Sequence, residues 1–120
     1  MMKLAFVFRS TPFGTATTRE GLDALLAASA FCYEEDIGVF FLDDGVFNLL
    51  TQQQSEKILQ KDVTSVLKLL DLYEIERRYV CQESLEMAKI DIANCVIDCV
   101  IKDRATILTL LSQAEKILTF

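Results

Sequence analysis

The sequence predicts an α/β fold: a three-layer α/β/α sandwich around a mostly parallel five-stranded sheet. Apolar runs alternate with amphipathic helical patterns along the whole chain. The runs are nearly continuous rather than alternating, which is typical of strands covered on both faces. Strands joined through helices make right-handed crossovers and lie parallel. At 120 residues, the chain has room for one domain, expected to span residues 1–120.

The first strand and the first helix are predicted on either side of a loop. Lys3 to Phe8 is a continuous apolar run and forms the first strand. The chain breaks at Pro12-Phe13-Gly14, after which Thr17 or Thr18 can cap a helix. The stripe of this helix that should face the sheet consists of Leu22, Leu25, Leu26, Ser29 and Tyr33.

The middle of the chain supplies a second strand and a second long helix. Asp36 to Leu42 is the strand, Asp43-Asp44-Gly45 its turn, and Val46 to Leu50 a short helix or helical turn. Thr51 to Ser55 is polar and uncharged, and is expected to be a surface loop. A helix is predicted from Asp62 to Leu72, with a stripe of Val63, Val66, Leu67 and Leu70.

Three strands and two helices complete the fold. Ile75 to Cys81 is the third strand, Gln82 to Met87 a short helix and Cys95 to Ile101 the fourth strand. Asp103 can cap a last helix, and Lys116 to Phe120 is the fifth strand. The stripe of that last helix is Ile107, Leu110, Leu111 and Ala114.

Charge and hydrophobicity limit the partners. With 18 acidic and 12 basic residues the net charge is −6, which disfavours direct binding to nucleic acid. The one basic cluster, Arg77-Arg78, is interpreted as a solvated strand edge. Hydrophobic residues make up 52% of the chain, more than a small domain hides easily, so assembly with other chains is expected. We find no signal-peptide pattern and no apolar stretch that approaches the roughly 20 residues of a membrane span, so a soluble cytoplasmic protein is expected.

Metal and disulfide sites are not predicted. The chain has no histidine, and its four cysteines, Cys32, Cys81, Cys95 and Cys99, include no Cys-x-x-Cys pair. Cys95 and Cys99 would share one face of the fourth strand, about 13 Å apart by the strand rise. We therefore expect free thiols.

Cofactor loops and acid pairs also give weak signals. Gly14 and Gly21 fit neither glycine-rich nucleotide pattern, and no cofactor is predicted. A small flavin-binding or enzymatic α/β domain remains an alternative, because hydroxyl groups occur where a flavin phosphate loop would lie: Ser10, Thr11, Thr15, Thr17 and Thr18. The acidic pairs Glu20/Asp23 and Asp43/Asp44 are interpreted as a solvated helix face and a turn, respectively.

Cys81 is the candidate catalytic residue. It ends a strand and precedes a short helix, whose unpaired N–H groups and dipole favour a thiolate. The nearby Glu83 opposes that charge, and free cysteine is commonly an inert buried residue. Both a sulfur-carrying and an inert Cys81 are left open by the residues alone.

Several segments together resemble the DsrE/DsrF/DsrH family of small sulfur-handling proteins, and within it the TusC/DsrF branch. They are Lys3 to Phe8, the Gly14-Thr15 loop with Arg19 to Ala27, Phe40 to Phe47, Lys68 to Leu70, Leu72-Tyr73, Tyr79 to Cys81 and Ile117 to Phe120. The resemblance implies a three-layer α/β fold and a cytoplasmic dimer of heterotrimers with TusB-like and TusD-like subunits. That complex would pass persulfide sulfur, through a TusE-like acceptor, towards 2-thiolation of the tRNA wobble uridine. A DsrF-type role in sulfur oxidation is the alternative within the family.

The resemblance also bears on Cys81. In that family the sulfur-carrying cysteine belongs to the TusD/DsrE subunit, where it precedes an Ala-rich, basic helix. Cys81 occupies what looks like the same place, but the segment that follows it, Gln82 to Glu86, is acidic. The expected role is therefore a non-catalytic or accessory subunit, without direct contact to nucleic acid or membrane.

Overall fold

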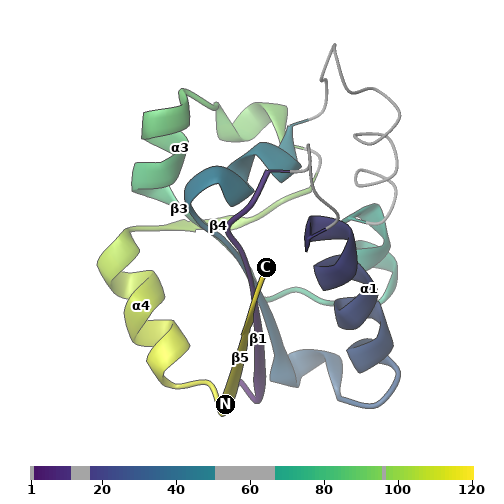
Figure 1. Ribbon diagram of the computed structural model, residues 1–120. Helices are drawn as coiled ribbons and strands as arrows, with labels where there is room; N and C mark the ends of the chain where they lie inside the picture. Colours follow the sequence, from purple (N-terminus) through teal and green to yellow (C-terminus); the bar gives the residue numbers. More distant parts are fainter. Residues whose placement is uncertain (1, 12–16, 51–66, 96) are drawn as a thin grey trace.

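The computed structural model describes residues 2–11, 17–50, 67–95 and 97–120 (Figure 1). Within these ranges, the strands (β), α-helices (α) and 3₁₀ helices (η) follow in the order β1 (Leu4–Phe8), α1 (Thr17–Ser29), η1 (Glu34–Asp36), β2 (Ile37–Phe41), η2 (Asp43–Leu49), helical residues 67–72, β3 (Arg78–Cys81), α3 (Gln82–Ala88), η3 (Ile92–Asn94), β4 (Val100–Lys102), α4 (Arg104–Ser112) and β5 (Lys116–Thr119). None of the helices in these ranges is long and apolar enough to cross a membrane.

The strands form one sheet in the order β4-β3-β2-β1-β5, and every neighbouring pair is parallel. The predicted α/β fold with a five-stranded sheet is confirmed. The first strand lies beside the last, so that Phe6 of β1 pairs with Val39 on one side and Leu118 on the other. The edges of the sheet are therefore β4 and β5.

Helices cover both faces of the sheet (Figure 1). On one face α4 packs through Ile107 and Leu111. On the other face lie α1 and helical residues 67–72. Successive residues of β1 and β2 contact these two layers in turn, because side chains alternate along a strand. Both sets must be apolar, which explains the continuous apolar runs of the sequence.

Stacked phenylalanine rings join the sheet to α1. Phe8 stacks on Phe41, with ring centroids 5.6 Å apart, and on Phe120, at 5.8 Å. Gly21 of α1 lies against the same rings, and a Cβ atom there would be 2.6 Å from Phe8 and from Phe120. A larger residue at this position would push α1 away from the sheet.

The predicted fourth strand, Cys95 to Ile101, is wrong in its bounds. Asp91 caps η3 by accepting a hydrogen bond from Ala93 N, and Cys95 forms only an isolated antiparallel bridge with Leu50. Ile97 is buried in the core from a loop, and β4 begins at Val100. The apolar residues here serve packing rather than a strand ladder, so Cys95 and Cys99 do not share a strand.

Three further predictions need correction. Arg78 is not a solvated edge residue, because it is buried in β3 and its guanidinium pairs with Asp71. The stripe of α1 does not extend to Tyr33, because the helix ends at Ser29 and the Tyr33 side chain is exposed. The third strand is also shorter than predicted and begins at Arg78.

Other local predictions agree with the structure. Asp103 caps α4, where its carboxylate accepts a hydrogen bond from Thr106 N at 2.9 Å. The predicted helical turn after β2 is η2, which already begins at Asp43. The predicted cap of α1 differs: the helix already includes Thr17 and Thr18, and the Thr18 hydroxyl donates to the carbonyls of Ser10 and Thr11 rather than accepting from a helix N–H. The predicted loop Thr51 to Ser55 and residues 62–66 of the middle helix lie outside the described residues.

Gly45 is required by the close approach of η2 to the end of β1. A Cβ atom at Gly45 would lie 1.8 Å from the carbonyl oxygen of Phe8, which is backbone and cannot move alone. We expect Gly45→Ala to lower the free energy of unfolding by about 3 kcal/mol. The matched control is Gly38→Ala, where the clash is with the flexible Met2 side chain and the expected loss is about 1 kcal/mol. Urea unfolding of both variants checks this, and an equal loss would contradict it.

Candidate functional site

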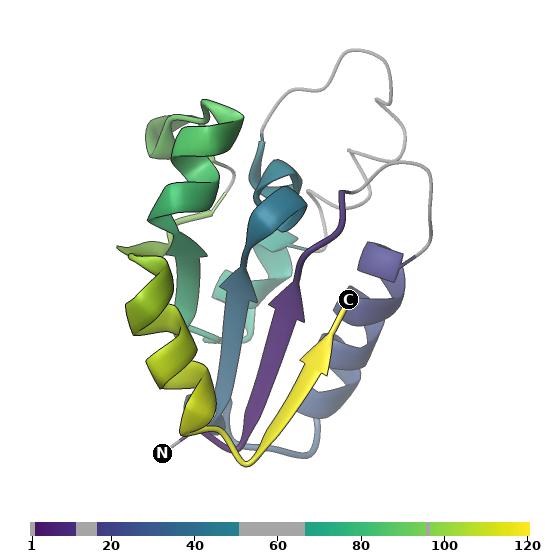
Figure 2. The ribbon, with the colours of Figure 1, turned by 60° about the vertical axis from the view of Figure 1, so that its left-hand side comes forward.

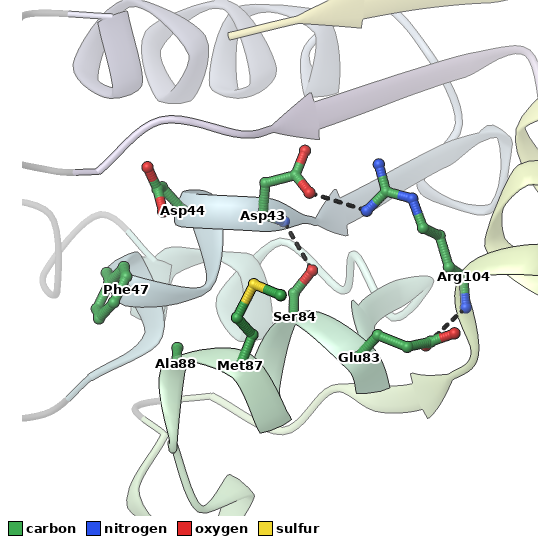
Figure 3. A pocket seen from close by; sticks show the side chains of 8 residues that line it. All are labelled: Asp43, Asp44, Phe47, Glu83, Ser84, Met87, Ala88 and Arg104. Carbon is green, nitrogen blue, oxygen red and sulfur yellow. Dashed lines mark hydrogen bonds and ion pairs between the residues drawn. The ribbon is translucent and has the colours of Figure 1, made fainter.

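A cavity of about 380 Å³ opens at the carboxyl edge of the sheet (Figure 3). The edge is formed by the ends of β1, β2 and β3, and η2 and α3 lie over it (Figure 2). Ligand sites of open parallel sheets occur at this edge. The cavity has an apolar side and a polar side; its lining residues are Asp43, Asp44, Phe47, Glu83, Ser84, Met87, Ala88 and Arg104.

Asp43 holds the polar side together. Its Oδ2 accepts a hydrogen bond from Arg9 Nε at 2.7 Å, and its Oδ1 accepts one from Arg104 Nη1 at 2.8 Å. Its backbone N–H donates to Ser84 Oγ at 2.8 Å. Residues that follow β1, β2 and β4 therefore meet at one carboxylate, and α3 joins them through Ser84.

The charges in this cluster stabilise each other. The hydrogen bond from Arg104, assisted by that from Arg9, lowers the pKa of Asp43 below its ordinary value. In turn, the hydrogen bond to Asp43 raises the pKa of Arg104. The carboxylate is thus ionised at neutral pH and fully engaged, which makes it a structural counter-ion rather than a general base.

Cys81 lies beneath this cluster, at the place that the sequence predicts. It is the last residue of β3 and the N-cap of α3, and its side chain is 0% exposed. The thiol donates to Glu83 Oε1 over 3.8 Å, and the same oxygen accepts a hydrogen bond from Arg104 N at 2.9 Å. Reactive cysteines lie in partly exposed, electropositive surroundings. Cys81 is instead covered; its thiol is bonded to the Glu83 carboxylate, and the Arg104 guanidinium also lies close enough to interact with it.

The other cysteines lie elsewhere in the fold. Cys95 and Cys99 pack against the core on the opposite face, and Cys32 follows α1. Burial raises the pKa of Cys99 to about 12 and also raises the pKa of Cys95. Both thiols are protonated at neutral pH, which agrees with the predicted packing role.

One hydroxyl group of the predicted phosphate loop is engaged within the protein. Thr18 uses its hydroxyl to bond the carbonyls of Ser10 and Thr11, and Thr15 lies outside the described residues. Ser10 lines an open concavity with Arg9, but Asp43 and Asp44 line it too, and their charge has the wrong sign for a phosphate group.

The predicted acid pairs differ in outcome. Asp23 forms an exposed ion pair with Arg19 on α1, as expected of a solvated helix face. Asp43 and Asp44 lie at the start of η2. Their interpretation as a turn is incomplete for Asp43, because its carboxylate also pairs with Arg9 and Arg104. In the described ranges, no group of three or more His, Cys, Asp or Glu side chains is placed to hold a metal ion.

Sequence reasoning missed Arg9, Ser84 and Arg104. Each stands one to three residues beyond a strand or cap that was predicted, but nothing in the local pattern indicates that they share one partner. The positive φ of Asp43, 51°, is likewise invisible in the sequence, since aspartate is a common turn residue. The assembled site can hold an apolar group against Phe47 and Met87, beside a neutralised ionic cluster.

We expect Asp43→Asn to lower the free energy of unfolding by about 1–2 kcal/mol at pH 7, because a carboxylate shared by two guanidinium groups is lost. Asparagine tolerates the positive φ, so the backbone is kept while the charge and one of the two acceptor oxygens are removed. The pKa of Asp43 is lower in the folded protein than its ordinary value of 3.8. The Asp43 carboxylate therefore stabilises the fold above pH 3.8, and this stabilisation is lost as the pH falls below that value. The difference between the variant and the unaltered chain should therefore shrink in acid. Asp44→Asn, an exposed neighbour, is the control; equal losses in urea unfolding would contradict the expectation.

The whole chain is similar to known proteins. A model of the DsrE/DsrF-like family matches residues 2–120. The chain is 66% identical over 119 residues to the protein TusC homolog of Pasteurella multocida, covering 99% of this chain and 100% of the relative. It is 52% identical to the protein TusC homolog of Haemophilus influenzae, with the same coverage. It is 48% identical to that of Vibrio parahaemolyticus, over 100% of both chains.

A solved structure gives the same fold. The crystal structure of the YchN protein from E. coli superposes with a TM-score of 0.81 over 100% of both chains, at 20% identity. The sheet, its layers and the matches along the full sequence agree, and the chain belongs to the DsrE/DsrF-like family.

Proposed function

We propose that this protein is a non-catalytic, accessory subunit of a TusBCD-like sulfur-relay complex. The observation that carries the proposal is the 66% identity, along the whole chain, to a protein TusC homolog. The complex would pass persulfide sulfur, through a TusE-like acceptor, towards 2-thiolation of the tRNA wobble uridine. The similarity to TusC homologs favours this process over sulfur oxidation.

The surroundings of Cys81 support an accessory role. A sulfur carrier must be reached in turn by a donor and by an acceptor, whereas Cys81 is fully buried. The Arg104 guanidinium interacts with Cys81 but is bonded to Asp43, and the Arg104 backbone N–H donates to Glu83. The relay cysteine is therefore assigned to a TusD-like partner.

The sheet edges support assembly with TusB-like and TusD-like subunits, and the net charge supports an indirect route of sulfur to tRNA. Val100 and Ile101 of β4 are exposed at one edge of the sheet, and Ile117 of β5 at the other. Exposed apolar side chains on strand edges are commonly covered by a partner. The charge of −6 keeps this subunit from binding tRNA itself, so sulfur would reach the RNA through other proteins.

We expect the chain to co-purify with TusB-like and TusD-like subunits after co-expression, and to elute with them as a dimer of heterotrimers. Size-exclusion chromatography with mass determination of the retained chains is the measurement. In cells that lack this protein, 2-thiouridine in tRNA should fall. A chain that elutes alone while its two partners assemble without it would refute the proposal.

Cys81→Ser should leave sulfur transfer by the assembled complex within about twofold of its normal rate. The cost in stability is about 1–2 kcal/mol, because a smaller and more polar hydroxyl replaces a buried thiol that packs in the core. The measurement combines tRNA 2-thiouridine content with intact-mass location of persulfide label on each subunit. Cys32→Ser, at a partly exposed cysteine, is the matched control. Label on this subunit that disappears with Cys81→Ser, together with transfer, would show that Cys81 carries sulfur.

A further inference from the structure

Four large apolar side chains are exposed where the chain enters β2 and β3, at the end of the sheet opposite to the cavity. Phe31 and Tyr33 follow α1. Leu72 is the last of helical residues 67–72, and Tyr73 follows it. Phe31 is 88% exposed and Leu72 is 70% exposed. Because β2 and β3 are parallel neighbours, these two segments lie side by side, and Val39 N donates to Arg77 O at 2.8 Å. We call residues 31–35 and 72–77 the amino-end face.

The same face carries an excess of negative charge. Glu34, Glu35, Glu74 and Glu76 line a concavity of about 250 Å³, together with Arg77. In the part of the chain that the structure describes, none of these four glutamates forms an ion pair. Four carboxylates therefore stand against one guanidinium, next to apolar rings.

Charge decides which occupant this face can take. A second copy of the chain, related by two-fold symmetry, would place carboxylates against carboxylates. A nucleic acid or an anionic lipid surface would be repelled for the same reason. A cationic partner with apolar side chains would complement both the acidic and the apolar side chains of this face. Its basic side chains would pair with the glutamates, and its apolar side chains would cover Phe31 and Leu72.

We propose that the amino-end face binds a basic amphipathic segment of another protein, one in which Lys or Arg accompanies apolar residues. This interaction lies at the opposite end of the sheet from Cys81 and the cavity, and it goes beyond the proposed accessory role. The two can therefore fail independently.

The test uses the full chain and a 14-residue peptide of Leu and Lys at helical spacing, labelled for fluorescence anisotropy. Two matched peptides replace Lys by Glu, or Leu by Ser. We expect both to bind at least tenfold more weakly than the Leu/Lys peptide. Glu34→Gln with Glu74→Gln should weaken binding of the Leu/Lys peptide about tenfold, and so should Phe31→Ser with Leu72→Ser.

The control pair is Glu20→Gln with Glu115→Gln, which removes the same charge elsewhere and should change affinity less than twofold. An equal loss in the control pair would overturn the proposal, because binding would then follow net charge alone. Lack of binding by the Leu/Lys peptide would also overturn it. So would a dimer of the unaltered chain in sedimentation velocity that Phe31→Ser with Leu72→Ser abolishes, since the occupant would then be a second copy.

Discussion

The carboxylate of Asp43 ties together segments that are distant in the sequence. Arg9 reaches it from the end of β1 and Arg104 from the start of α4, while Ser84 of α3 bonds its backbone. Exposed ion pairs usually contribute little to stability. Here one carboxylate serves two guanidinium groups and its backbone is fixed, so the cluster acts as a network. These contacts hold in place the loops that line the cavity at this edge of the sheet.

The same interaction limits what chemistry the edge can perform. Arg104 is occupied by Asp43, and the thiol of Cys81 faces the carboxylate of Glu83. Catalytic sites keep a charged group or a nucleophile available to a substrate, whereas here both are paired within the protein. Phe47, Met87 and Ala88 form the apolar part of the lining, with Met87 almost fully exposed, and Asp44 and Glu83 add carboxylates beside them. The exposed apolar side chain offers a contact surface for another molecule.

Much of the fold could be predicted because it is encoded locally. The buried strands Leu4–Phe8 and Ile37–Phe41 are continuous apolar runs, and the cap of α4 is a single aspartate before a helical pattern. The fourth strand could not be placed, because an apolar residue such as Ile97 is equally suited to a buried loop. The Asp43 cluster was beyond reach for a different reason: its partners are 34 and 61 residues away, and only the strand order brings them together. The position of Cys81 at the end of a strand could be predicted from the sequence. Its burial could not, because burial depends on the tertiary packing around it.

The exposed edge at β4 has a consequence for how the cell must handle this chain. β4 is the outermost strand of the sheet, and its apolar residues Val100 and Ile101 are exposed. Free backbone N–H and C=O groups next to apolar side chains pair readily with any extended chain that they meet. A copy made in excess of its partners thus displays the features that chaperones and proteases recognise in unfinished proteins. Balanced synthesis of the subunits would then be enforced by removal of the surplus.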